Sequence, residues 1–124
     1  MSTLSPKVML VDDDELHNEM LKTALERRGF VVCTESNATN ALKTALGFKP
    51  DVVVCDIAMP GKSGRNVMQE FKAHRTTRDT PFIFLSSLVV KREEGKSADQ
   101  HLMLAKPIDI IQLEQYIREC LKSD

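Results

Sequence analysis

The sequence predicts an α/β protein with a doubly wound parallel sheet of five strands and helices on both faces. Two observations predict this fold. Five short apolar runs alternate along the chain with segments whose apolar residues recur at helical spacing. Four of these runs are nearly continuous in apolar residues, as expected of strands buried on both faces of a parallel sheet. Strands and helices that alternate in this way are joined by right-handed crossovers.

The predicted strands are short and evenly distributed. They cover residues 7–11, 30–33, 52–55, 82–85 and 102–105. In sheets of this type, functional sites lie beyond the carboxyl ends of the strands. The residues that follow each strand are therefore the first candidates for a site.

Helical periods fill the segments between the strands. The first covers residues 16–25 and is followed by Gly29 at a C-terminal cap position. Asn37 is expected to cap a second helix that ends at Gly47.

The remaining segments differ in the strength of their pattern. Residues 67–71 carry part of a third amphipathic helix, and Asp109 begins the last helix in a variant of the capping box. Residues 88–101 have Gly95 at their centre and little apolar face, which predicts only a short or frayed helix.

Composition places the chain among ordinary globular domains. It has 124 residues, 42% of them hydrophobic and 28% charged, with a formal net charge of −1. It contains no apolar run of the roughly 20 residues that a membrane span needs, and residues 1–6 do not form a signal peptide. These features predict a cytoplasmic protein that binds neither membrane nor, by this chain alone, nucleic acid.

Polar residues stand at the ends of four predicted strands. These residues are Asp12-Asp13-Asp14, Asp56, Ser86-Ser87 and Lys106. Each has a simpler explanation when taken alone, since an aspartate can cap a helix or stabilise a turn. Their common placement at one edge of the sheet instead indicates a site.

Electrostatics indicates what this site holds. Two carboxylates about 5 Å apart repel by on the order of 3 kcal/mol at an effective dielectric constant of 20. A cluster of aspartates therefore favours a bound cation, and oxygen ligands at a partly hydrated site suit Mg²⁺. A metal flanked by a carboxylate, a hydroxyl and an ammonium group is typical of phosphoryl-transfer chemistry.

The order and spacing of these residues resemble the response-regulator receiver domains of two-component signalling, including the chemotaxis regulators. The matching motifs are Val11-Asp12-Asp13, the segment Asp56-Ile57-Ala58-Met59-Pro60-Gly61-Lys62-Ser63-Gly64, Leu85-Ser86-Ser87 and Lys106-Pro107. The resemblance implies a single domain over residues 1–124, with its core at about 7–122. It also implies a flavodoxin-like strand order of 2-1-3-4-5.

The resemblance implies a role for each site residue. Asp56 is expected to accept the phosphoryl group and bind Mg²⁺, together with Asp13, the backbone carbonyl of Ala58, and Asp12 acting through water. Ser86 and Lys106 are expected to contact the phosphoryl group after transfer. The implied donor is a histidine kinase or a histidine-phosphotransfer protein. The output is expected through a downstream protein target or a fused effector, and a weak homodimer is compatible with the pattern.

One departure from the family pattern concerns the switch. Met103 stands where most receivers carry a tyrosine or phenylalanine, three residues before Lys106. The alternative function is therefore a pseudo-receiver, a protein-interaction module that keeps the fold with little or no phosphorylation switching. An aspartyl-phosphate phosphatase would need a second acid at Ala58, so no turnover of an external substrate is expected. Asp56 and Pro60 likewise exclude a nucleotide-binding P-loop that ends at Gly61-Lys62-Ser63.

Overall fold

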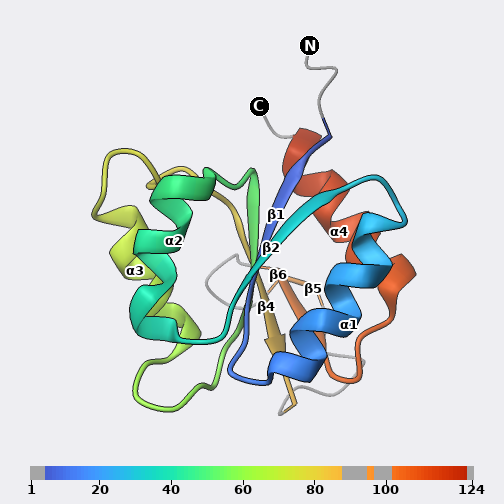
Figure 1. Cartoon of the computed structure of the whole chain (residues 1–124), viewed down its shortest axis with the longest axis horizontal. Helices are drawn as coiled ribbons and strands as arrows, with labels where there is room; N and C mark the ends of the chain where they lie inside the picture. The colour runs from blue at the N-terminus through green and yellow to red at the C-terminus, as the bar shows by residue number, and fades with distance from the viewer. Residues whose placement is uncertain (1–4, 88–94, 97–101, 123–124) are drawn as a thin grey trace.

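The computed structural model describes residues 5–87, 95–96 and 102–122 (Figure 1). The elements in chain order are β1 (Lys7–Val11), α1 (Glu15–Glu26), β2 (Val31–Glu35), a 3₁₀ turn (Ala38–Asn40), α2 (Ala41–Phe48), β3 (Val52–Asp56), α3 (Gly64–Lys72), β4 (Phe82–Ser86), β5 (Gly95–Lys96), β6 (Leu102–Ala105) and α4 (Ile110–Lys122). Among the described helices, none combines the length and apolar character that crossing a bilayer requires.

The predicted sheet is confirmed. The strands lie in the order β2-β1-β3-β4-β6-β5, and the first five of them pair in parallel. With β6 as the fifth predicted strand, this is the expected order 2-1-3-4-5. The additional strand β5 has two residues and pairs antiparallel with β6 at the edge of the sheet.

Strand β5 corrects one prediction. Residues 88–101 were expected to form a short or frayed helix, but Gly95 and Lys96 are extended and pair with Met103 and Leu102. The other residues of that segment lie outside the described part of the chain. The extended conformation agrees with the low helix propensity of glycine and with the weak apolar pattern around it.

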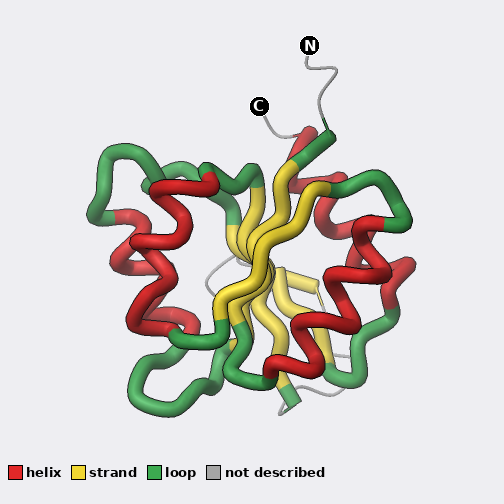
Figure 2. The backbone as a smooth tube through the Cα atoms, in the orientation of Figure 1, coloured by secondary structure: helices red, strands yellow, loops and turns green. Residues whose placement is uncertain are grey.

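Helices cover both faces of the sheet, with α1 and α4 on one side and α2 and α3 on the other (Figures 1 and 2). Successive side chains of a strand point to opposite faces, so each inner strand contributes to two cores. In β1, Val8 and Leu10 pack on the side of α1 and α4, while Met9 and Val11 pack on the side of α2 and α3. This burial on both faces explains the continuous apolar runs.

Some of the expected helix boundaries are observed and two are not. Helix α1 ends at Glu26 with Arg27 as its C-terminal cap, so Gly29, with φ 97°, lies beyond the cap position predicted for it. Asp14 caps α1 through its side chain, and Asn37 caps the 3₁₀ turn that leads into α2. The prediction that Gly47 ends the second helix is wrong, because α2 continues to Phe48 and Lys49 takes the left-handed conformation with φ 58°. A glycine next to a helix end favours termination but does not require it.

Gly64 determines how closely α3 approaches the end of β3. A Cβ at this position would lie 2.5 Å from the carbonyl oxygen of Asp56 and 3.0 Å from the Cα of Ile57. The Gly64 amide also donates a hydrogen bond to the Ile57 carbonyl at 2.9 Å. Only glycine allows this packing without a shift of the backbone that carries Asp56.

We therefore expect Gly64→Ala to destabilise the protein by about 1–3 kcal/mol, because the crowded atoms belong to the backbone. The matched control is Gly47→Ala in α2, where an added Cβ meets open space. That variant should stabilise the protein by about 0.5–1 kcal/mol through better helix propensity. Urea unfolding of both variants measures the two effects. Equal stability of Gly64→Ala and the parent would contradict the packing described.

Candidate functional site

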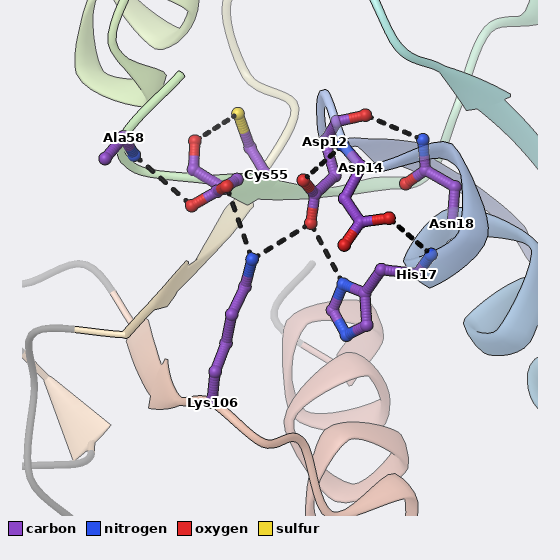
Figure 3. A network of polar contacts seen from close by, with 8 residues as sticks. Asp12, Asp14, His17, Asn18, Cys55, Ala58 and Lys106 are labelled. Carbon is purple, nitrogen blue, oxygen red and sulfur yellow. Dashed lines mark hydrogen bonds and ion pairs between the residues drawn. The ribbon is translucent and has the colours of Figure 1, made fainter. Parts of the chain in front are cut away.

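The carboxyl ends of β1, β3, β4 and β6 meet at one edge of the sheet. The parallel register pairs Asp56 with Leu85 and Ser86 with Ala105, so the ends of neighbouring strands are aligned. This alignment brings together the side chains of Asp12, Asp56 and Lys106, which are far apart in the sequence. Figure 3 shows the contact between Lys106 and Asp12. The predicted gathering of strand-end residues is therefore observed for these three.

An acidic cluster forms the centre of the site. Carboxylate oxygens of Asp12, Asp13 and Asp56 lie within 4.8 Å of one another. Asp12 and Asp56 are buried, with 2% and 7% of their surface exposed, whereas Asp13 is exposed. Such a set of oxygen donors, open on one side, fits a hard divalent cation that keeps part of its water shell.

Lys106 compensates part of the negative charge. Its Nζ lies 3.1 Å from Oδ2 of Asp12 and 3.3 Å from Oδ2 of Asp56, so one ammonium group bridges two carboxylates. Burial alone would lower the pKa of Lys106, but its contacts with Asp12 and Asp56 raise it above the ordinary value. The lysine therefore remains a cation at this edge of the sheet.

The two buried carboxylates differ in their surroundings. Burial and the neighbouring charge of Asp12 raise the pKa of Asp56, against the opposing effects of the Ala58 amide and Lys106. Burial also acts to raise the pKa of Asp12, but hydrogen bonds from Asp14, His17 and Lys106 outweigh it and hold the pKa below the ordinary value. Asp12 is thus the better-supported anion of the pair.

The loop after β3 fixes Asp56 from its own side. The Ala58 amide donates to Oδ1 of Asp56 at 3.3 Å, and the Ile57 amide donates to the carbonyl of Leu85 at 2.9 Å. Ala58 is exposed at the edge of the site. The proposed use of its carbonyl as a metal ligand stays a prediction.

Helix α1 supplies two residues that sequence reasoning did not place in the site. Nδ1 of His17 lies 2.9 Å from Oδ2 of Asp12, and Nδ2 of Asn18 donates to the Asp12 carbonyl at 2.8 Å (Figure 3). The strand-end rule could not find them, because they reach the site from the first turn of a helix. The signal in the sequence is their distance of five and six residues from Asp12, across the cap formed by Asp14.

The two candidate switch residues are placed differently. Ser86 is buried at the end of β4, and its carbonyl accepts a hydrogen bond of 2.9 Å from the Lys106 amide. Met103 lies farther inside the sheet, beside Phe84, and is buried in the core on the side of α2 and α3. The structure thus puts Ser86 at the edge of the site and Met103 behind it.

Neutralising Asp56 tests this electrostatic arrangement. A raised pKa in the folded state means that folding favours the protonated carboxyl, so the ionised form lowers stability above that pKa. Asp56→Asn should therefore melt at a higher temperature than the parent at neutral pH without divalent metal. The difference should shrink as the pH falls toward the ordinary value of 3.8, because the parent carboxyl is then protonated too.

Thermal melts between about pH 4 and about pH 7.5 in EDTA measure this effect. Asp79→Asn is the control, since Asp79 is an exposed aspartate in the turn before β4. A gain in melting temperature that is the same at all pH values would show that repulsion at Asp56 is not its cause.

Comparison with known proteins agrees with this geometry. Residues 8–118 match the family model of the response regulator receiver domain. The chain is 30% identical over 117 residues to the response regulator PleD of Caulobacter vibrioides, covering 93% of this chain and 26% of that protein. It is 33% identical over 120 residues to the transcriptional regulatory protein PrrA of Mycobacterium tuberculosis, covering 95% and 51%. The chain thus spans between about a quarter and about half the length of these relatives.

Solved structures show the same fold. A response regulator from Desulfuromonas acetoxidans superposes with a TM-score of 0.81 at 28% identity, over 94% of this chain and 97% of that chain. The receiver domain of a Francisella response regulator gives a TM-score of 0.81 at 26% identity, over 95% and 98%. The matched sequence, the sheet order and the acidic edge agree, and the chain belongs to the response regulator receiver domain family.

Proposed function

We propose that this chain is a phosphoaccepting receiver that acts as a single domain over residues 1–124, with its core at about 7–122, in the cytoplasm. Asp56 accepts a phosphoryl group from a histidine kinase or a histidine-phosphotransfer protein. The observation that carries the proposal is the contact of Lys106 with both Asp12 and Asp56 beside the acidic cluster. This arrangement offers an oxygen nucleophile, a fixed cation and a set of metal ligands within one small site.

The transfer reaction uses Asp56 as the nucleophile. A carboxylate oxygen of Asp56 attacks phosphorus, a P–O bond forms, and the P–N bond to the donor histidine breaks. The electron pair of that bond returns to the imidazole nitrogen of the donor. Lys106 is close enough to neutralise charge on the transferred group, because its ammonium already contacts Asp56.

The donors at the site fit Mg²⁺. The carboxylates of Asp13 and Asp56 supply oxygen ligands, Asp12 beside them acts through water, and the Ala58 carbonyl is the proposed backbone ligand. When bound, Mg²⁺ neutralises charge on the phosphoryl oxygens. The chain turns over no external substrate in this proposal, which limits its catalysis to its own phosphorylation and slow dephosphorylation.

The phosphorylated state would be read out through Ser86, Lys106 and Met103. A phosphoryl group adds about −1.5 to −2 charges and three acceptor oxygens at Asp56. Ser86 and Lys106 can each donate to these oxygens, which gives the two states different contacts. Signal then passes to a downstream protein or to an effector fused to the domain.

Met103 supports a second candidate function, the pseudo-receiver. Its side chain is already buried in the core beside Phe84, with 7% of its surface exposed. Most receivers carry a tyrosine or phenylalanine here, and the methionine does not offer that aromatic side chain to the switch. If this difference removes switching, the chain is a protein-interaction module that keeps the fold, and it shows little phosphorylation.

Labelling with acetyl phosphate and Mg²⁺, followed by intact mass measurement, separates the two functions. The parent should gain one phosphoryl group, and Asp56→Asn should gain none, because an amide cannot form the acyl phosphate. Asp79→Asn should be labelled like the parent. An unlabelled parent would favour the pseudo-receiver, and a labelled Asp56→Asn would move the acceptor to another residue.

The metal ligands have a separate test. Mg²⁺ that binds the folded state alone stabilises it by RT ln(1 + [L]/Kd), so the melting temperature of the parent should rise with added Mg²⁺. Asp13→Asn should melt higher than the parent in EDTA because one repulsive charge is removed, and it should gain less from Mg²⁺. A full Mg²⁺ response in this variant would exclude Asp13 from the metal site.

A further inference from the structure

The polar atoms of Asp12 are held from several directions. Its Oδ1 accepts from the Asp14 amide at 3.0 Å, and its carbonyl accepts from Nδ2 of Asn18 at 2.8 Å. Its Oδ2 has two partners, Nδ1 of His17 at 2.9 Å and Nζ of Lys106 at 3.1 Å. Within the described part of the chain, these are the two side chains that donate to this carboxylate.

The two partners of Oδ2 differ in what else they contact. Lys106 is shared with Asp56 at 3.3 Å. His17 belongs to the first turn of α1, and its amide is held by the cap residue Asp14 at 3.1 Å. His17 is thus anchored on the side of Asp12, whereas Lys106 lies between the two carboxylates.

A phosphoryl group on Asp56 would change the position of Lys106. A dianionic group with three acceptor oxygens attracts the ammonium more strongly than a single carboxylate does. When Lys106 turns toward it, Oδ2 of Asp12 loses one of its two donors. A carboxylate with 3% of its side chain exposed cannot replace that donor freely with water, so the loss is costly unless another donor remains.

We propose that His17 is a positioning residue that holds the carboxylate of Asp12 in place while Lys106 is engaged with the phosphoryl group. This inference rests on the proposed phosphoacceptor function. A carboxylate only accepts hydrogen bonds, so Nδ1 of His17 is the donor in this contact. Asn18 holds the main chain of Asp12 beside it but does not reach the carboxylate.

The proposal predicts an effect that depends on the state of the site. Without ligand, and with Mg²⁺ alone, Lys106 still supports Oδ2 of Asp12, so the loss of His17 is partly compensated. With the phosphoryl mimic beryllofluoride bound in the presence of Mg²⁺, the compensation is gone. Partners that hold a metal-ligating carboxylate typically contribute 10–100-fold to affinity at metal sites.

The experiment compares the binding of Mg²⁺ alone and of beryllofluoride with Mg²⁺, measured by calorimetry for the parent and three variants. His17→Ala should weaken beryllofluoride binding about tenfold or more, and Mg²⁺ binding by a clearly smaller factor. His17→Asn should recover much of the affinity, because an asparagine amide can place an N–H close to the position of Nδ1. His74→Ala is the matched control and should bind both ligands like the parent. His74 follows the C-terminal end of α3, and its Nδ1 accepts a hydrogen bond from the Thr76 amide.

Ligand-free melts of all four proteins complete the test, and they should show similar melting temperatures for His17→Ala and His74→Ala. Undiminished beryllofluoride binding by His17→Ala would overturn the proposal. An equal loss of Mg²⁺ and beryllofluoride affinity, or a large loss of ligand-free stability that His17→Asn does not restore, would overturn it as well. A parent protein that does not bind beryllofluoride would refute the proposed function itself. If the parent binds it and His17→Ala binds it equally tightly, only the role of His17 is refuted.

Discussion

The site depends on one ammonium group between two buried carboxylates. Asp12 and Asp56 are almost fully buried, and without compensation their charges would destabilise the edge of the sheet that carries them. Lys106 contacts both and acts to lower both pKa values, yet the pKa of Asp12 lies below the ordinary value and that of Asp56 lies above it. Asp12 has further hydrogen-bond donors, whereas Asp56 keeps a net penalty. The residue with the less stable negative charge is the one proposed to react.

The parallel sheet makes this arrangement possible. In parallel strands the carboxyl ends lie side by side, so Asp12, Asp56 and Lys106, separated by 44 to 94 positions in the sequence, meet at one edge. Cores on both faces of the sheet fix the strands that carry them. Gly64 then allows α3 to pack directly against the backbone of Asp56, which holds the loop behind the carboxylate. The apolar packing and the charged edge are therefore parts of the same construction.

Much of this could be predicted from the sequence, because the strongest signals have local causes. Apolar runs indicate buried strands, and a polar residue after each run indicates an edge, which was enough to place Asp12, Asp56 and Lys106 together. The cap at Asp14 follows from the same local chemistry. Contacts from outside the strand ends were not predictable in this way. His17 reaches Asp12 only because α1 starts at a particular angle, and no periodic pattern encodes that angle.

Two differences from the sequence-based expectations arise from competition between local preference and tertiary packing. Gly47 has the conformational freedom to end a helix, yet α2 continues by one residue to Phe48. The side chain of Phe48 packs against the core on the side of α2 and α3. Lys49 then adopts the left-handed conformation at the end of the helix. Gly95 was expected in a frayed helix, but pairing with β6 provides backbone hydrogen bonds that an isolated turn of helix around a glycine would hold only weakly.

In the proposed switch, the shared lysine offers a route that does not depend on an aromatic residue. In the unmodified state, the free energy of the Lys106 contacts is divided between Asp12 and Asp56, so a new anion at Asp56 redistributes existing interactions. In the proposed phosphorylated state, this redistribution would act on Asp12, which His17 of α1 contacts, and on β4 through the hydrogen bond between the Lys106 amide and the Ser86 carbonyl. Met103 is packed in the core beside Phe84, next to the strand that ends in Ser86. In the proposed switch, a movement of Ser86 at the end of β4 would therefore reach Met103 through packing, which does not require an aromatic ring.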